Sequence, residues 1–237
     1  MRATNWEFKY RALIFGLIFG CSFALYSLDN QNSTAALANW LEPRLRIDAS
    51  LLARVLFAFA TFLLIVAAFI RTWASSYLQA KVVYASDVKT ESLVADGPYR
   101  HVRNPLYFAN IFLALGLGAM MSRTGFFVAV IAMLVFCYRL IFREEADLEA
   151  SQGEPYRLYR NAVPRLWPAL GPRVPSAGRP AQWPEGFKAE FWCWGIAVSV
   201  AAFAITLNSP IFFVILALSL AVFWFSSSIL QKKNPRS

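Results

Sequence analysis

Six long apolar blocks constrain this chain more than any other feature of its sequence. The blocks are Ala12–Leu28, Val55–Ile70, Pro105–Ser122, Thr124–Tyr138, Phe191–Leu207 and Ile211–Leu230. Each is close to the roughly 17–25 residues that an α-helix needs to cross a bilayer. Only 16% of the 237 residues are charged, whereas soluble domains usually carry about a quarter. The sequence therefore predicts an all-α integral membrane protein, a bundle of about six transmembrane helices with cytoplasmic surface helices.

The first block has a second possible interpretation, a secretory signal peptide, because Arg2, Lys9 and Arg11 precede it. Its apolar run is longer than the roughly 7–15 residues of a signal-peptide core, and no small-residue cleavage site follows it. We therefore expect a retained first span. The three cysteines also lie inside apolar blocks, and their spacing fits no metal site, so we expect them to pack in the bundle.

The distribution of Lys and Arg predicts the orientation. If the N-terminus is cytoplasmic and all six blocks cross, Asp29–Ser50 becomes an outside loop. Of the 23 Lys and Arg residues, all but Arg44, Arg46, Arg54 and Arg123 then lie inside. The positive-inside rule thus favours a multi-pass protein of the inner (plasma) membrane with both termini in the cytoplasm. The net charge of +9 then reflects topology and attraction to anionic lipid headgroups, and no basic run with interleaved aromatics suggests nucleic acid.

Two cytoplasmic segments, Arg71–Arg103 and Arg143–Lys188, carry most of the polar residues. The second is rich in proline, and we expect short helices and turns there. The fourth span has no helix breaker before Gly153 and Pro155, so its helix should continue into the cytoplasm. This divides the chain into three parts: 1–90 with N-terminal transmembrane helices and a surface segment, 91–168 with a functional core, and 169–237 with a Pro-rich linker and a C-terminal transmembrane hairpin.

The segment Gly97–Asn110, GPYRHVRNPLYFAN, is unusually polar for the entrance to a membrane helix. Pro105 suits the first turn of a helix because its missing N–H would have no partner there. The N–H groups of Leu106 and Tyr107, with the positive end of the helix dipole, predict an anion site at the membrane surface. Two arginines add positive charge: Arg100 and Arg103. The alternative is a basic membrane anchor followed by a capped helix.

A second polar feature is the carboxylate pair Glu144 and Glu145, where the fourth helix leaves the bilayer. Such a pair is costly unless it faces water, a partner or a ligand. Ion pairing with Arg139, Arg143 or Arg103 is one explanation. The other is a ligand whose anionic part meets the start of the third span and whose cationic or hydroxyl-rich part meets the glutamates.

Four motifs then occur in a characteristic order. They are LVADGPYRHVRNPLY from Leu93 to Tyr107, REE from Arg143 to Glu145, GEPYRLY from Gly153 to Tyr159 and VPRLWP from Val163 to Pro168. In this order and spacing they resemble the isoprenylcysteine carboxyl methyltransferase family, within the wider phospholipid methyltransferase superfamily. The resemblance covers about Glu91–Pro168.

The resemblance implies a membrane-embedded methyltransferase that uses S-adenosylmethionine and acts on a lipidic or prenylated acceptor entering from the bilayer. The cofactor-binding residues that it implies are Ser92, Leu93, Val94, Tyr99, Arg103, Asn104, Pro105, Leu106, Tyr107, Glu144 and Glu145. Arg139 and Arg143 are the candidate catalytic residues, which would orient an anionic headgroup. The family usually has His where this chain has Asn104, and often where it has Glu91.

Methyl transfer from a sulfonium is a direct displacement, so the protein's tasks are alignment and exclusion of water. A carboxylate acceptor needs no base, whereas an amine must first lose a proton. The sole histidine, His101, is interpreted as structural. Carboxyl O-methylation is therefore favoured over phospholipid N-methylation.

Two other classes of function stay open. A nicotinamide-dependent membrane reductase would have a similar Arg-x-Pro-x-Tyr helix entrance. A non-catalytic membrane protein, such as a small transporter or an assembly factor, is the third possibility. Gly116-x-Gly118 lies inside an apolar block with no strand before it, so it predicts close helix packing instead of a dinucleotide fingerprint.

Overall fold

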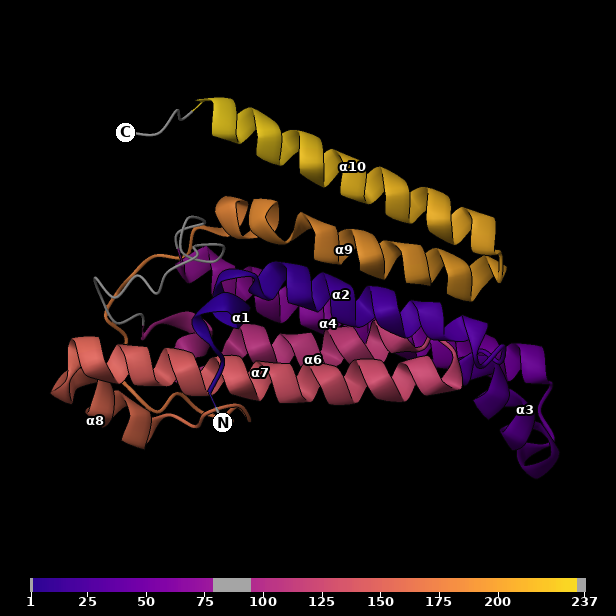
Figure 1. Ribbon diagram of the computed structural model, residues 1–237, viewed down its shortest axis with the longest axis horizontal. Helices are drawn as coiled ribbons and strands as arrows, with labels where there is room; N and C mark the ends of the chain where they lie inside the picture. The colour runs from indigo at the N-terminus through magenta and orange to yellow at the C-terminus, as the bar shows by residue number, and fades with distance from the viewer. Residues whose placement is uncertain (1, 79–94, 234–237) are drawn as a thin grey trace.

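The computed structural model describes residues 2–78 and 95–233, and for 223–233 the backbone alone. Its elements in chain order are α1 (Asn5–Lys9), α2 (Arg11–Ala24), η1 (Leu25–Ser27), α3 (Ser33–Leu45), α4 (Ala49–Tyr77), η2 (Gly97–Arg100), α6 (Pro105–Gly118), α7 (Arg123–Gln152), α8 (Glu154–Ala162), α9 (Trp183–Thr206) and α10 (Ser209–Lys233). Helices α2, α4, α6, α7, α9 and α10 run roughly lengthwise (Figure 1). All six apolar blocks are thus helical, which confirms the predicted all-α membrane bundle.

Three helices, α4, α7 and α9, are long and apolar enough to cross a membrane. The apolar stretches of the other three are shorter within the described residues: Arg11–Ser27, Pro105–Gly118 and Ser209–Val222. Many large apolar side chains on the outside of the bundle are exposed, among them Phe59, Ile131 and Leu218. Such faces are typical of helices that contact lipid.

The predicted continuation of the fourth span is confirmed. Helix α7 ends at Gln152, and Gly153 closes it with a φ of 61°, a conformation that glycine adopts without steric cost. Helix α8 starts directly afterwards, with Pro155 in its first turn. The two adjacent carboxylates of this region, Glu144 and Glu145, therefore lie on a continuous helix, two turns before its end.

Three boundaries differ from the sequence prediction. The segment expected to be an outside loop contains helix α3, whose Asn32 N-cap accepts a hydrogen bond from the Ala35 N–H. Helix α9 begins at Trp183 instead of Phe191, because Pro184 suits the first helical turn. Helix α6 ends at Gly118, short of the expected end of its block.

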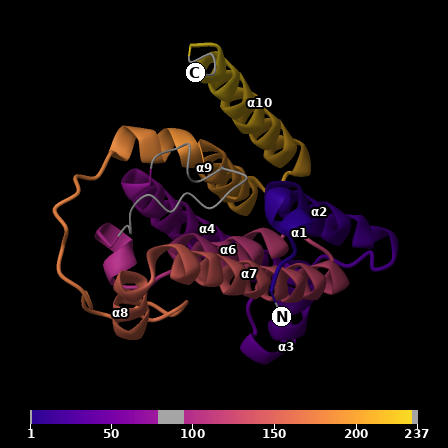
Figure 2. The same cartoon turned by 60° about the vertical axis from the view of Figure 1, so that its left-hand side comes forward.

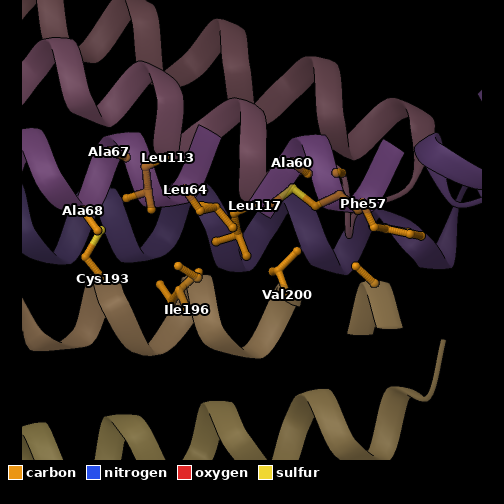
Figure 3. Close-up of a cluster of buried hydrophobic side chains, with 14 of the residues drawn as sticks. Phe57, Ala60, Leu64, Ala67, Ala68, Leu113, Leu117, Cys193, Ile196 and Val200 are labelled. Carbon is orange, nitrogen blue, oxygen red and sulfur yellow. The ribbon is translucent and has the colours of Figure 1, made fainter. Parts of the chain in front are cut away.

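Helix α4 lies at the centre of the bundle, with its main contacts to α6 and α9. Figure 3 shows apolar side chains of all three helices meeting in one buried cluster, including Leu64, Leu113 and Ile196. A Cβ on Gly116 would lie 2.6 Å from Leu64 Cγ and 2.9 Å from the Ala60 carbonyl oxygen. The glycine therefore permits close packing of α6 on α4, as the sequence predicted.

The polar elements gather at one end of the bundle. Helices α1 and α8 lie toward that end, called the α8 end below, and α3 lies toward the opposite end (Figure 1). The segment 163–182 then joins α8 to α9 along one side, as Figure 2 shows. Helix α10 packs on α9 at the edge of the bundle.

Candidate functional site

The entrance to α6 is a short helical turn followed by a proline-initiated helix. Gly97 opens η2 with a φ of 56°, and Tyr77 lies so close that a Cβ on Gly97 would clash with its ring. Asn104 occupies the N-cap position of α6, but its side chain makes no capping hydrogen bond. The first amides of α6, at Leu106 and Tyr107, are therefore not capped by that side chain.

Segment 159–173 lies along this entrance and is joined to it by hydrogen bonds that each involve a main-chain group. The Tyr159 hydroxyl donates to the Tyr99 carbonyl oxygen at 2.8 Å. The Arg103 N–H donates to the Pro164 carbonyl oxygen at 2.9 Å. These bonds fix the polar turn before α6 against α8 and the loop that follows it. His101 takes part in the same contact, with its Nδ1 3.1 Å from the Ala169 carbonyl oxygen, which agrees with its structural interpretation.

Asp96 anchors the far end of the same loop. Its carboxylate accepts hydrogen bonds from the Ser176 hydroxyl at 2.5 Å, the Ala177 N–H at 2.9 Å and the Arg179 N–H at 3.1 Å. Burial by itself raises the pKa of Asp96, but these donors outweigh it and hold the pKa below its usual value. Asp96 is therefore ionised at neutral pH and closes the loop over η2.

Glu145 is saturated by donors of the chain itself. Its Oε1 lies 2.9 Å from Arg103 Nη2 and accepts from Asn104 Nδ2 at 3.2 Å. Its Oε2 accepts from Arg165 Nε at 3.0 Å. Arg103 also donates to the carbonyl oxygens of Arg160 and Val163. Glu145 thus pairs with Arg103, one of the ion pairs considered from the sequence, and joins α7 to the α6 entrance and the 159–173 segment.

Glu144 has a different environment. The Tyr107 hydroxyl donates to Glu144 Oε1 at 2.7 Å, and Glu144 as a whole residue is half-buried. An ionised carboxylate has about four lone-pair directions on two oxygens, so Glu144 can accept further hydrogen bonds from a ligand. The tyrosine at the same time fixes the orientation of the carboxylate relative to α6.

The two arginines on α7 contact the N-terminal segment. Arg139 Nη2 is 2.7 Å from Glu7 Oε2, and the Ala3 N–H donates to the Arg139 carbonyl oxygen at 3.0 Å. The Arg139 hydrogen bond, with a second from the Thr4 N–H, lowers the pKa of Glu7 to about 2. Arg143 Nε lies 3.4 Å from Asp147 Oδ2, one turn further along the same helix. Their predicted role with an acceptor stays a prediction.

The structure therefore brings together most of the residues predicted for a cofactor site. Those that lie around the α6 entrance and the last turns of α7 are Tyr99, Arg103, Asn104, Pro105, Leu106, Tyr107, Glu144 and Glu145. Ser92, Leu93 and Val94, with Glu91, lie outside the described residues. Arg139 and Arg143 precede the glutamates on α7 and contact Glu7 and Phe8 of α1.

Sequence reasoning missed two groups of residues. Arg165 stands in the VPRLWP motif but was not expected to bind Glu145. A second polar group lies deeper, where Arg71 meets Glu190 and Asn110. The sequence did contain a signal for the second group, because Glu190 is a charged residue within an apolar helix once α9 is taken to begin at Trp183.

Comparison with known proteins finds a family that matches part of the chain, including most of the site. The phospholipid methyltransferase family matches residues 55–154, a range that starts in α4 and includes α6, α7 and both glutamates. The partial resemblance expected from the sequence is thereby confirmed, and it supports a methyltransferase-like membrane protein. The match extends further toward the N-terminus than Glu91, but it ends at residue 154 instead of Pro168, so the VPRLWP motif, α9 and α10 lie beyond it.

Two curated relatives are similar over 100 residues. The cobalt-zinc-cadmium resistance protein CzcN of Cupriavidus metallidurans is 29% identical, over 42% of this chain and 43% of its own length. The nickel-cobalt-cadmium resistance protein NccN of Alcaligenes xylosoxydans xylosoxydans is 27% identical, over 42% of this chain and 44% of its own length. The chain thus spans less than half the length of the relatives it matches. No solved structure matches.

Proposed function

We propose that the protein is an S-adenosylmethionine-dependent methyltransferase of the membrane that acts on a lipidic or prenylated acceptor. One observation carries the proposal. Within the range matched by the phospholipid methyltransferase family, the start of α6 and the glutamates of α7 meet at the α8 end of the bundle, with Tyr107 bound to Glu144 at 2.7 Å.

The residues at this place suit the two ends of the cofactor. The amides of Leu106 and Tyr107 at the start of α6 would hold its carboxylate, because helix N-termini favour anions. Glu144 would accept hydrogen bonds from its ammonium or ribose hydroxyl groups. Glu145 is already occupied by Arg103 and Arg165, so we assign it to the frame of the site. When bound, S-adenosylmethionine supplies an activated methyl group.

The acceptor chemistry that we favour is carboxyl O-methylation. A carboxylate is already a nucleophile, and an arginine of α7 already holds one: Arg139 binds the carboxylate of Glu7. An acceptor carboxylate would take the place of Glu7 on Arg139, with Arg143 one turn away on the same helix. Movement of Glu7 away from Arg139 would leave this arginine free to bind the acceptor carboxylate. The lipid tail of the acceptor would lie among the helices.

Phospholipid N-methylation is the second candidate, because the matching family is described as phospholipid methyltransferases. Its amine acceptor would release a proton to solvent. The two relatives are named for resistance to metal ions. We do not propose that this chain binds metal ions directly. Within the described residues no group of three or more His, Cys, Asp or Glu side chains could hold a metal ion.

The test is transfer of a labelled methyl group from S-adenosylmethionine to membrane lipid extract by the purified protein. We expect label in the lipid fraction that alkali releases as methanol, because methyl esters hydrolyse in base. Label that resists alkali would identify the N-methyl alternative. No label, together with binding of a nicotinamide cofactor, would identify the reductase and overturn the proposal.

A further inference from the structure

A buried layer of polar side chains crosses the bundle below the α6 entrance. Arg71 of α4 donates from Nε to Glu190 Oε2 of α9 at 2.6 Å, and from Nη1 to Asn110 Oδ1 of α6 at 2.6 Å. The Ser75 hydroxyl donates to Glu190 Oε1 at 2.8 Å. Glu190 is 0% exposed, Arg71 7% and Asn110 5%. The ion pair thus joins α4 to α9 in an apolar interior, and the hydrogen bond from Arg71 to Asn110 adds α6.

The layer lies directly beneath the candidate site. Asn110 follows Pro105 by five residues, which at about 1.5 Å per residue places it about 8 Å below the start of α6. It follows Tyr107 by three residues, so the two side chains leave neighbouring positions of the helix surface. Whatever fixes Asn110 therefore also fixes the rotation and depth at which α6 presents Tyr107 and its first amides.

Helix α9 also docks on α4 through contacts other than this ion pair. A Cβ on Gly186 would lie 2.6 Å from the Thr72 carbonyl oxygen, so the two backbones are in close contact there. Trp194 Nε1 donates to the Thr72 hydroxyl at 3.0 Å, and the apolar cluster in Figure 3 joins the same helices. A buried ion pair adds little net stability compared with apolar residues of similar volume. Stabilisation of the α4–α9 contact therefore does not by itself account for the ion pair.

We propose that Glu190 and Arg71 are positioning residues for the site at the start of α6. Glu190 holds the guanidinium of Arg71 in one orientation, and Arg71 in turn holds the amide of Asn110. The site is then completed by α9, which lies outside the range that the family matches. This inference rests on the proposed function for the identity of the ligand, but the positioning itself can be measured without one.

The experiment compares three variants of the full chain. Arg71→Met/Glu190→Met replaces the ion pair by apolar groups of similar volume. Asn110→Ala removes the link to α6 and leaves the ion pair. Thr72→Val is the matched control, because it removes a polar contact between α4 and α9 that does not reach α6. Thermal unfolding, affinity for S-adenosylmethionine and hydrogen exchange of the amides of 106–110 are measured for each.

We expect the double variant to keep its melting temperature within a few degrees of the wild type, since apolar replacement of a buried pair is often tolerated. Its affinity should fall about tenfold or more, because small misplacements of binding groups have large effects. Asn110→Ala should lose affinity similarly, and Thr72→Val should not. In the absence of ligand, amides 106–110 should exchange faster in the first two proteins than in the control.

Unchanged exchange at 106–110 in both the double variant and Asn110→Ala would overturn the positioning role. The same holds if Thr72→Val speeds exchange as much as they do, since the effect would then be general loosening of the helices. If the double variant does not fold, Asn110→Ala alone decides. A wild type that fails to bind S-adenosylmethionine would instead refute the proposed function, and the exchange result would still decide the positioning role.

Discussion

Arg103 and Glu145 form a buried ion pair that fastens the turn before α6 to the last turns of α7, with Arg103 Nη2 2.9 Å from Glu145 Oε1. Each side chain is 8% exposed. The pair also involves Asn104 and Arg165, so three segments of chain, α7, the α6 entrance and segment 159–173, meet at a single carboxylate. Neighbouring Glu144 is half-buried as a residue and accepts one hydrogen bond, from the Tyr107 hydroxyl. We therefore propose separate roles for the two adjacent glutamates, Glu145 in the frame of the site and Glu144 toward the ligand.

Glu145→Gln should destabilise the fold. It leaves the buried guanidinium of Arg103 without its counter-charge, and breaking a buried pair on one side costs about 3–5 kcal/mol. Thermal unfolding in detergent would measure the loss. The matched control is Glu149→Gln on the same helix, whose partners Arg157 and Arg160 are 55% and 37% exposed. That control should cost under about 1 kcal/mol. Equal melting temperatures for the two variants would contradict a structural role for Glu145.

Glu144→Gln should show the opposite behaviour. The amide keeps an acceptor for the Tyr107 hydroxyl, so the melting temperature should change little. Loss of a charged hydrogen bond to the ligand should weaken S-adenosylmethionine binding by about 1.5–3 kcal/mol, or roughly 10- to 150-fold. Calorimetric titration gives the affinity. A variant that binds normally but melts early would assign Glu144 to the frame as well.

Asn104 should contribute mainly through the frame. Its amide donates to Glu145 Oε1 at 3.2 Å and to the Arg165 carbonyl oxygen at 3.0 Å. Asn104→Ala should therefore cost about 0.5–1.5 kcal/mol of stability per lost hydrogen bond, with a smaller effect on affinity. Asn104→His should keep or modestly strengthen binding, since it restores the residue typical of the family and its ring N–H can still donate. Complete loss of binding in Asn104→Ala with an unchanged melting temperature would make the side chain a ligand contact.

Acid should release helix α1 from α7. Because the pKa of Glu7 is lowered from 4.5 to about 2, its ion pair with Arg139 stabilises the docked segment fully above pH 4.5. That stabilisation is lost as the pH falls from 4.5 toward 2. Hydrogen exchange of residues 4–10, corrected for intrinsic rates, should rise over this range in the wild type. Glu7→Gln should exchange faster already at neutral pH and show little further change. A wild type whose exchange is flat between pH 5 and pH 2 would refute the contribution.

The sequence predicted the elements of this fold better than their contacts. The apolar blocks, the helix that starts at Pro105 and the end of α7 at Gly153 follow from local residue chemistry, and the structure has all of them. Helix α3 was missed because its sequence is short of a clear apolar face, although Asn32 is a good N-cap. The partners of Glu145 were narrowed to three arginines, and Arg103 was among them.

What could not be predicted depends on how helices rotate against one another. Arg165 approaches Glu145 only because the chain after α8 folds back over the α6 entrance. Glu190 meets Arg71 because α9 packs closely on α4 at Gly186. Neither arrangement has a periodic signal in the sequence, since each joins residues far apart in the chain through a single geometry of packing.

The central claim is that amides at the start of α6 hold the anionic end of S-adenosylmethionine, and titration of wild type and Leu106→Pro tests it most directly. Proline removes the Leu106 N–H, and this chain already accepts proline at the second helical position at Pro155, Pro184 and Pro210. We predict that the wild type binds S-adenosylmethionine and not nicotinamide cofactors. Leu106→Pro should melt like the wild type and bind about tenfold more weakly or worse, the effect of losing a charge-assisted hydrogen bond. Equal affinity of the two proteins, or no binding by the wild type, would contradict the account.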